Sequence, residues 1–565
     1  MRRNLLLAFV LVLLTLALPV TVLGNVTVAP GGGTLGTSSN FQLVGHNPLF
    51  NRGMNAALTI FDHYVYIGNR SDASNSCGDL ASSGPVVPVL TPTNPDGTCT
   101  HVRPGIQIVD IQDPSDPTVV GEIPASVAVP NAAGEPVGVT SRELRVWPQK
   151  KLLIEMAFRC SRVIHACPRP PITTPPTPAD VSFPFYLKFF SLEDPVHPQL
   201  ISTFVPTASR LTGSDGLPLK IKPHEMYLWV DPNNPDRALL WMSFPTSSVN
   251  PDRPNLEILD ISNVASGGAP VDIAEGNWNQ LFPGAATPAN YDFDLALHSM
   301  APTADGKTTY LAYLRGGMLV LDTSDVVADT DDHFISLNDK LLTPIANRPT
   351  WGAGNQCAGH TAAGCSESHS SIPIPGTNFE LNVDEVYGTF TDPSFGWPWA
   401  WVRLIDVADP AHPTIVGEYK IFQNSQAFQG SPGDDPATEQ FTSYGSHNPT
   451  ATPHLDFNAW HSGGLQAIDI SEPATPFQAG WFSPTPLVSV ALEDPALSRG
   501  PNKVVMWSYP IIRNGLIYVI DIRNGLYVLR YTGPHQGEVK QIQFLEGNSN
   551  LGDAVTLAQG GGDQP

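Results

Sequence analysis

The sequence has few basic residues and few of the motifs that mark familiar chemistry. Of 565 residues, 30 are Lys or Arg and 53 are Asp or Glu, with no Lys/Arg run. Because phosphate backbones and anionic membrane surfaces are bound through basic patches, neither nucleic acid nor such a membrane is an expected partner. The chain also lacks G-x-S-x-G, P-loop, G-x-G-x-x-G and H-E-x-x-H motifs, which excludes the ready-made sites that these motifs build.

Long apolar runs are absent after the first residues. The chain begins with Met1 and two Arg, continues through an apolar stretch from Leu5 to Leu18, and reaches a small-residue exit at Gly24. This pattern predicts a signal peptide over residues 1–24, with an uncleaved N-terminal anchor as the alternative. No later stretch has the roughly 20 apolar residues of a spanning helix. We therefore expect a secreted, periplasmic or cell-surface protein with no membrane span after cleavage.

Cysteine is scarce, and no C-x-x-C spacing is present, which argues against a thiolate metal site. The six cysteines fall into three close pairs, which are Cys77 with Cys99, Cys160 with Cys167, and Cys357 with Cys365. In an oxidising compartment this clustering predicts three local disulfide bonds. All three would stiffen long loops on one face of the molecule.

Proline and glycine are abundant, with 56 and 48 residues. A helical bundle is excluded because each proline inside a helix costs about 3 kcal/mol. A hydrophobic fraction of 41% is nevertheless too high for a disordered chain. The composition therefore predicts a large core that is buried between many turns.

One pattern recurs along the chain: an apolar run ending in Asp, an Asp-Pro-x-x-Pro turn, and a β-branched run that often ends in Gly. Clear copies run from Ile106 to Gly121, Arg403 to Gly417 and Leu465 to Gly480, and looser copies begin at Tyr186, Leu256, Met318 and Leu526. Each copy indicates a strand, a turn and a strand, and two further strand-like runs precede it. Seven such units predict an all-β fold, a seven-bladed β-propeller of four-stranded antiparallel blades.

The ends of the ring are predicted to meet. The last copy lacks its final strand, and Phe41 to Gly45 resembles that strand, so an N-terminal strand should close the last blade. The propeller then spans residues 41–535. Residues 25–40 and 536–565 are rich in small and polar residues, which predicts a flexible N-terminal segment and a flexible C-terminal tail. We expect a monomer.

These repeats resemble the LVIVD-repeat proteins, which are secreted or surface propellers. The resemblance is clearest from Ser446 to Pro473, in SHNPTATPHLDFNAWHSGGLQAIDISEP. It implies the fold over about residues 41 to 532. It implies no single biochemical role, because fold does not determine function.

Four successive blades begin their innermost strand with a histidine: His224, His298, His369 and His447. From each histidine to the Asp ending the third strand, the separation is 36 or 37 residues where an insertion intervenes and 24 or 22 where none does. The four positions should therefore be equivalent and converge on the channel mouth of one face, called the top face here. Four neutral imidazoles suit Zn, Cu or Fe better than Mg or Ca.

Three further residues are candidate outer partners of such an ion: Glu225, Glu367 and His461. A purely structural alternative stays open, in which the histidines bond the backbone at the channel mouth. The corresponding positions of the other blades hold no histidine: Asn55, Arg142 with Glu143, and Trp507 with Ser508.

Three functions fit these observations. The first is an exported binding protein whose top face holds a metal ion and a small-molecule, polymer or protein ligand. The second is a metal-dependent oxidoreductase or hydrolase using the same histidines, by architectural analogy with propeller oxygenases that hold iron through four His. The third is an adhesion module without metal. The binding protein is the preferred function, because no general acid or base can be named from the sequence. An open coordination position, which four His would leave on Fe or Cu but not on tetrahedral Zn, would favour the enzyme.

Overall fold

The computed structural model describes most of the predicted propeller. The described residues are 25–29, 35–70, 103–125, 129–130, 136–137, 139–159, 185–246, 248–281, 297–314, 316–344, 368–385, 401–424, 428, 444–491 and 503–560. The predicted signal peptide, all six cysteines and Glu367 lie outside them. The signal peptide, the three disulfide bonds and the role of Glu367 therefore stay predictions.

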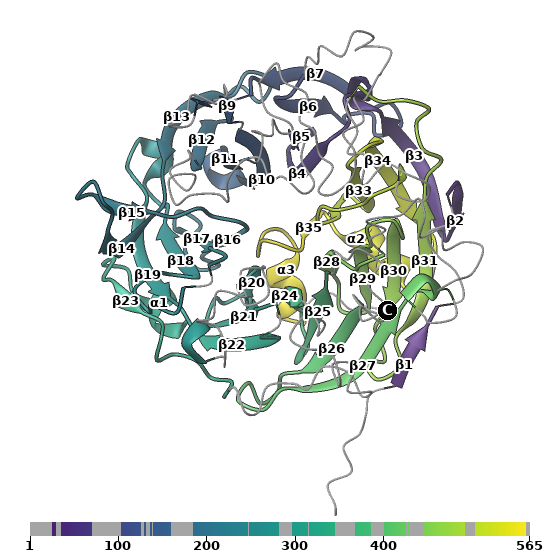
Figure 1. Cartoon of the computed structure of the whole chain (residues 1–565). Coiled ribbons are helices and arrows are strands. Elements are labelled where there is room, and N and C mark those ends of the chain that lie inside the picture. Colours follow the sequence, from purple (N-terminus) through teal and green to yellow (C-terminus); the bar gives the residue numbers. More distant parts are fainter. Residues whose placement is uncertain are drawn as a thin grey trace, which may run out of the picture.

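The strands form antiparallel sheets that stand radially around a ring (Figure 1). The sheets of the first half are β4 (Asn55–Phe61), β5 (Tyr64–Asn69), β6 (Ile106–Asp110) and β7 (Thr118–Ile123); β10 (Val139–Trp147), β11 (Leu152–Arg159), β12 (Tyr186–Ser191) and β13 (Gln199–Phe204); and β16 (Met226–Val230), β17 (Ala238–Ser243), β18 (Leu256–Asp260) and β19 (Val271–Gly276). The first two sheets touch through the pair Ser141 and Asn69.

The second half repeats this plan. Its sheets are β20 (Ser299–Pro302), β21 (Thr308–Ala312) and β22 (Met318–Asp322); β24 (Ser368–Pro373), β25 (Phe379–Asp384), β26 (Val402–Asp406) and β27 (Thr414–Lys420); β28 (Asn448–Ala451), β29 (Leu455–Ala459), β30 (Leu465–Asp469) and β31 (Phe477–Ser483); and β32 (Ile511–Arg513), β33 (Leu516–Asp521), β34 (Gly525–Tyr531) and β3 (Phe41–Asn47). The prediction of an all-β propeller is confirmed, and we interpret these sheets as its seven blades.

Short elements lie at the edges of the blades. They are the strand pairs β8 (Val129–Pro130) with β9 (Pro136–Val137) and β14 (Thr207–Thr212) with β15 (Pro218–Lys220), the edge strand β23 (Ile335–Ser336), and the helix α1 (Ser324–Ala328). Among the described residues, no helix combines the length and apolar character needed to cross a membrane.

The N-terminal closure is confirmed. Strand β3 pairs antiparallel with β34, and Phe41 lies opposite Tyr531. The two rings pack with centroids 5.3 Å apart. One blade is thus built from both ends of the chain, which closes the ring.

Contacts between neighbouring blades explain the glycine of the repeat. A Cβ atom on Gly417 would lie 2.0 Å from the carbonyl oxygen of Pro473, and one on Gly45 would lie 2.2 Å from that of Pro114. Both prolines belong to the turn of the following blade. Only glycine lets the outer strand approach this turn so closely, so the repeat encodes blade-to-blade packing as well as strands.

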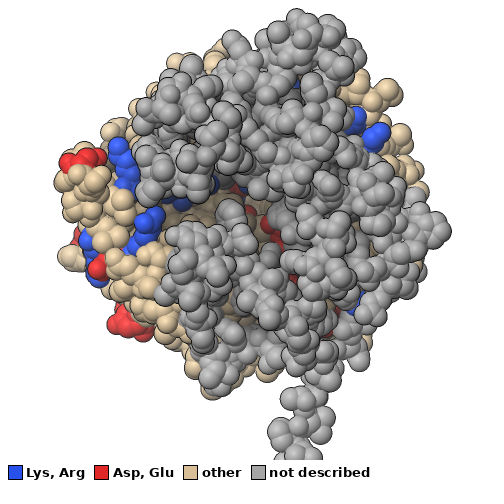
Figure 2. Space-filling view, viewed as in Figure 1, with Lys and Arg blue, Asp and Glu red and all other residues tan. Residues whose placement is uncertain are grey.

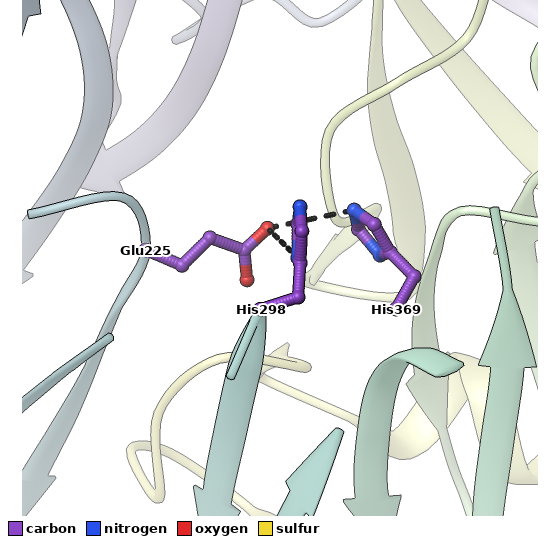
Figure 3. A group of neighbouring side chains, drawn as sticks. All are labelled: Glu225, His298 and His369. Carbon is purple, nitrogen blue, oxygen red and sulfur yellow. Dashed lines mark ion pairs between the residues drawn. The ribbon is translucent and has the colours of Figure 1, made fainter. Parts of the chain in front are cut away.

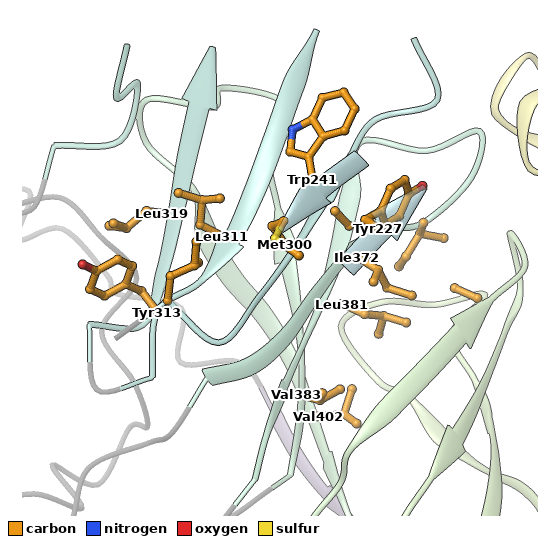
Figure 4. Close-up of a cluster of buried hydrophobic side chains, with 14 of the residues drawn as sticks. Tyr227, Trp241, Met300, Leu311, Tyr313, Leu319, Ile372, Leu381, Val383 and Val402 are labelled. Atoms are coloured by element: carbon orange, nitrogen blue, oxygen red, sulfur yellow. The ribbon is translucent and has the colours of Figure 1, made fainter. Parts of the chain in front are cut away.

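The largest core cluster extends from the blade of β16 to β19 into the blades of the second half of the ring (Figure 4). It joins Trp241 of β17, Met300 of β20 and Leu381 of β25, all buried. Burying a side chain of this size stabilises the fold by about 1.5–3 kcal/mol. The inner strands that carry the predicted histidines are therefore anchored on their hydrophobic faces.

The prediction of flexible end segments is wrong for the described residues. Strand β1 (Asn25–Val28) pairs in parallel with β27, and β2 (Thr37–Ser39) pairs with β31. After the last blade come α2 (Gln536–Gln541), β35 (Phe544–Glu546) and α3 (Ala554–Ala558). Although the C-terminal residues are mostly polar, three of their leucines are buried, which are Leu545, Leu551 and Leu557.

The C-terminal segment, residues 536–560, lies in the middle of the ring (Figure 1). Strand β35 pairs with the inner edge of β32, and Ser549 then forms a β-bridge to Leu228 in another blade. Asn550 donates from Nδ2 to the carbonyl oxygen of Val230 at 2.7 Å. The segment thus spans the channel and links two distant blades.

Candidate metal centre

The four predicted histidines come together at the starts of the inner strands. His224, His298 and His447 directly precede or lie just before β16, β20 and β28, and His369 is the second residue of β24. Centroid distances between successive rings are 4.4, 3.8 and 4.0 Å. The sequence register therefore identified four equivalent positions, and the ring geometry turns them into an arc of imidazoles.

Burial keeps these imidazoles neutral. It lowers the pKa of His447 to about 3 and that of His298 to about 4. Burial, followed by the charge of neighbouring histidines, also places the pKa values of His224 and His369 well below the ordinary 6.5. Neutral imidazoles are the form that binds transition metals.

Glu225 directs its carboxyl group at two of these rings (Figure 3). Its Oε1 atom lies 3.7 Å from Nδ1 of His298 and 3.8 Å from Nε2 of His369. Burial, and then the nearby charge of Glu143, raises the pKa of Glu225 well above its usual value. The protonated form of this acid is therefore favoured by its surroundings, although together with the two histidines it forms a group that could hold a metal ion.

Glu385, directly after β25, forms a second such group with His369 and His447, and sequence reasoning missed it. Its Oε1 atom lies 3.1 Å from Nε2 of His447, and its Oε2 atom lies 3.4 Å from Nε2 of His369. Burial alone would raise its pKa, but the imidazoles of His447 and His369 outweigh burial and hold the pKa well below 4.5. Glu385 is thus an ionised carboxylate that faces His447 and His369.

A sequence signal for Glu385 did exist. It follows the second strand of its blade, as His461 follows the second strand β29 of the next blade. His461 was identified by this position, at the start of the connection to the third strand. The same rule applied to every blade would have selected Glu385.

Hydrogen bonds fix the tautomers of both rings beside Glu385. Nδ1 of His447 donates to the carbonyl oxygen of Trp507 at 2.6 Å. Nδ1 of His369 bonds Oγ of Ser370 at 2.8 Å, and that hydroxyl donates to Oδ1 of Asn448 at 3.1 Å. Because each neutral ring carries its proton on Nδ1, both Nε2 lone pairs point toward the carboxylate.

This convergence leaves electron-rich atoms facing one another. The Nε2 atom of His369 is buried and has no hydrogen-bond partner among the described residues. A tetrahedral ion with bonds of 2.0–2.2 Å would hold its ligand atoms about 3.4 Å apart. The separations, 3.1 Å from Oε1 to His447 and 3.4 Å from Oε2 to His369, are near that spacing.

His461 and Trp507 form the adjoining wall. Nε2 of His461 lies 3.2 Å from Oε1 of Glu385, and its ring stacks on Trp507 at 4.6 Å. The guanidinium of Arg70 lies 3.9 Å from the Trp507 ring centroid. The positive charge of Arg142 contributes to lowering the pKa of His298. The mouth therefore has an imidazole–carboxylate side and a side with aromatic and cationic groups.

Charges on this face are unevenly distributed. Figure 2 shows described carboxylates in the middle of the ring, while side chains of both signs gather at the edge beside β14 and β15. A separate cavity of about 410 Å³ lies beside the C-terminal segment and is lined by Tyr227, Asp305, Gly376 and Glu546, among others. None of the clustered histidines lines this cavity, so it is distinct from the metal centre.

Comparisons with known proteins give a family match and distant structural similarities. The LVIVD repeat matches residues 102–124. The structure is similar to the periplasmic gluconolactonase PpgL of Pseudomonas aeruginosa, with 10% identity, 75% of this chain and 83% of that chain covered, and a TM-score of 0.37. It is also similar to the β-propeller domain of Cps50 (Swd1) from Myceliophteria thermophila, with 8% identity, 86% and 99% covered, and a TM-score of 0.40.

A third similarity is to Sqt1 from Chaetomium thermophilum, with 10% identity, 87% of this chain and 99% of that chain covered, and a TM-score of 0.40. No curated protein matches the chain. The chain thus has a match to the LVIVD repeat at residues 102–124, within the ring of sheets of a β-propeller.

Proposed function

We propose that this propeller is a metal-dependent enzyme whose ion is bound by His369, His447 and Glu385. The supporting observation is the meeting of an ionised buried carboxylate with two Nε2 lone pairs at 3.1 and 3.4 Å. Facing lone pairs repel one another unless a positive charge lies between them. A divalent cation supplies that charge and satisfies all three atoms.

The ligand set favours iron or zinc over copper. Two imidazoles and one carboxylate with open positions are typical of non-haem Fe(II) oxygenases, and His₂Glu sets occur in catalytic zinc sites. Three protein ligands leave at least one position for substrate or water. This open position favours an enzyme over a binding protein in which the ion has only a structural role.

The substrate is a small molecule that enters from the top face. The three ligand residues are all less than 9% exposed, so a polymer or a protein surface would not reach the ion. When bound, the ion would polarise the substrate or activate water or dioxygen. The chain orients the ligands through the Trp507 carbonyl and the Ser370 hydroxyl. We propose that the enzyme is exported, as residues 1–24 predict.

The experiment is metal analysis of the full chain purified from an exporting host, with and without His369→Ala. Because His369 belongs to both metal-ligand groups, its removal should lower the iron or zinc content by about one equivalent. His412→Ala is the matched control, since His412 is an exposed imidazole paired with Asp409 at 2.9 Å. Unchanged content in His369→Ala, or less than about 0.1 equivalent in the parent, would overturn the proposal.

Turnover separates enzyme from binding protein. The iron-loaded chain is assayed for oxygen consumption with panels of small organic substrates, and the zinc-loaded chain for hydrolysis of small esters and lactones. Activity that His369→Ala removes and His412→Ala keeps supports the proposal. Stoichiometric metal without turnover in either assay would favour the binding role.

A further inference from the structure

A second group of histidines and carboxylates joins the C-terminal segment to the underside of the blade formed by β28 to β31. His454 lies in the turn between β28 and β29, while His535 directly precedes the C-terminal segment and Glu538 lies in its first helix, α2. One ligand atom from each of the three lies within 4.8 Å of the others. We call these three residues the lower cluster.

The two imidazoles of the lower cluster lie face to face. Their ring centroids are 4.9 Å apart and their planes differ by 14°. Nδ1 of His454 lies 3.2 Å from Oε2 of Glu538. The atoms come from segments 84 residues apart in sequence, so the cluster forms only when the C-terminal segment docks on this blade.

Asp469 supports the cluster from behind. Its Oδ2 atom lies 3.2 Å from Nε2 of His535, while Oδ1 accepts hydrogen bonds from the backbone and side chain of Ser471. A carboxylate that binds one ring nitrogen of a histidine fixes the other nitrogen as the metal-binding atom. This arrangement leaves Nδ1 of His535 for an ion, beside Nδ1 of His454 and the Glu538 carboxylate.

From these contacts we propose that the lower cluster binds a zinc ion through His454, His535 and Glu538, with Asp469 as the outer partner of His535. Imidazole and carboxylate ligands together suit zinc rather than calcium or magnesium. The 3.2 Å separation between His454 and Glu538 is close to the roughly 3.4 Å of a tetrahedral zinc site. Solvent supplies the fourth ligand, because His535 is exposed.

The ion clamps the segment that spans the channel. After α2, the chain forms β35 on the inner edge of β32 and continues to Ser549 and Asn550, which bond the opposite blade. Between them, the side-chain oxygen of Asn548 accepts from Nη1 of Arg145 at 3.0 Å when its amide is oriented to satisfy both groups. Zinc at the lower cluster therefore stabilises the docked form of the whole segment.

Zinc titration of the full chain tests this proposal. Calorimetry uses Zn²⁺ alone as the probe and chelator-treated protein carrying His369→Ala. This substitution disables the proposed centre of His369, His447 and Glu385, which we call the upper centre. We expect about one equivalent of zinc to bind, and this binding to be lost when His535→Asn is added. Glu538→Gln should weaken it at least about 10-fold, whereas His412→Asn, on an exposed His–Asp pair without a second imidazole, should leave it unchanged.

Hydrogen exchange supplies a second readout that does not depend on enzyme activity. Zinc should slow amide exchange in β35 of the His369→Ala chain and have no effect when His535→Asn is present. His454→Asn, in a partly exposed turn, should behave as His535→Asn does and guards against a variant that does not fold. Absence of zinc binding in the His369→Ala chain, or zinc binding that survives both His→Asn changes, would overturn the proposal. Either result leaves the upper centre untouched.

Discussion

Strand β28 has a histidine cluster beyond each end, and the two clusters differ in their solvent exposure. At the upper end, His447 is buried beside Glu385 and His369. At the lower end, His454 is partly exposed, with 28% of its side chain accessible, and it meets the carboxylate of Glu538. The strand between them has only four residues. The same kinds of side chain are therefore buried at one end of this short strand and exposed to water at the other.

The comparison teaches that burial sets the charge states of the ligands in the upper cluster, whereas solvent reaches the ligands of the lower cluster. Burial lowers the pKa of His447 to about 3, so this ring is neutral at every physiological pH. The neighbouring imidazoles keep Glu385 ionised despite its burial. We expect a buried centre of this kind to hold its ion tightly, and the lower cluster, which is open to solvent, to release zinc when the concentration falls.

The largest effect, a change in the free energy of unfolding, is expected for a buried carboxylate whose negative charge is not offset by an imidazole. Asp456 of β29 lies opposite Ala451 of β28, and burial raises its pKa from 3.8 to about 8. Its ionised form is thus disfavoured in the fold, and the cost grows as pH rises from 3.8 toward 8, by about 1.4 kcal/mol per pH unit. Asp456→Asn should therefore raise the free energy of unfolding by up to about 4 kcal/mol at pH 7 and by little at pH 4.

Urea unfolding of parent and variant at both pH values measures this difference. Asp339→Asn, at an exposed carboxylate, is the control and should change the free energy of unfolding by less than about 0.5 kcal/mol. If Asp456→Asn raised the free energy of unfolding equally at pH 4 and pH 7, the added stability would not come from removing an ionisable group. The contrast between Asp456 and Glu385 would then lose its explanation.

The second prediction concerns metal affinity and distinguishes two candidate ligand groups. One is His369, His447 and Glu385, and the other is Glu225, His298 and His369. Glu385→Gln should weaken metal binding at least about 100-fold, because it removes an ionised ligand between two Nε2 atoms. Glu225→Gln should weaken it less than about 10-fold, since burial raises the pKa of Glu225 and so disfavours its ionised form as a ligand. The two substitutions are isosteric and both sites are buried, so each is the control for the other.

Competition against a chelator of known affinity measures both constants. The reverse order, with Glu225→Gln the more damaging change, would place the ion between Glu225, His298 and His369. That outcome would keep a metal centre in the upper cluster but overturn its assignment to Glu385.

The fold was predictable because the sequence pattern that marks a blade recurs along the chain. Each copy of the strand–turn–strand pattern identifies one blade, and the closing strand was visible since Phe41 to Gly45 supplies the strand that the last copy lacks. The C-terminal segment was not predictable in this way. Leu545, Leu551 and Leu557 are buried against other parts of the ring, and their spacing matches neither a blade nor a long amphipathic helix.

The candidate site was predictable only in part. The four histidines occupy equivalent positions at strand starts, so a register count was enough to align them. Glu385 follows a strand without any repeat of its residue type, and its low pKa depends on the imidazoles that folding brings near it. The lower cluster needs the docking of Glu538 beside His454, 84 residues earlier, which no local pattern indicates.

The smallest effect on metal binding is expected for His461, whose Nε2 atom approaches the same carboxylate oxygen of Glu385 as His447 does. Its backbone φ of +32° lies in the left-handed region, so Asn is the replacement that keeps the backbone and removes the imidazole. In the proposed centre the ion is bound by His369, His447 and Glu385, and His461, 3.2 Å from the carboxylate, would orient it. His461→Asn should therefore keep about one equivalent of metal and weaken its affinity less than about 10-fold. Complete metal loss in the same chelator competition, with the fold intact by circular dichroism, would make His461 a direct ligand.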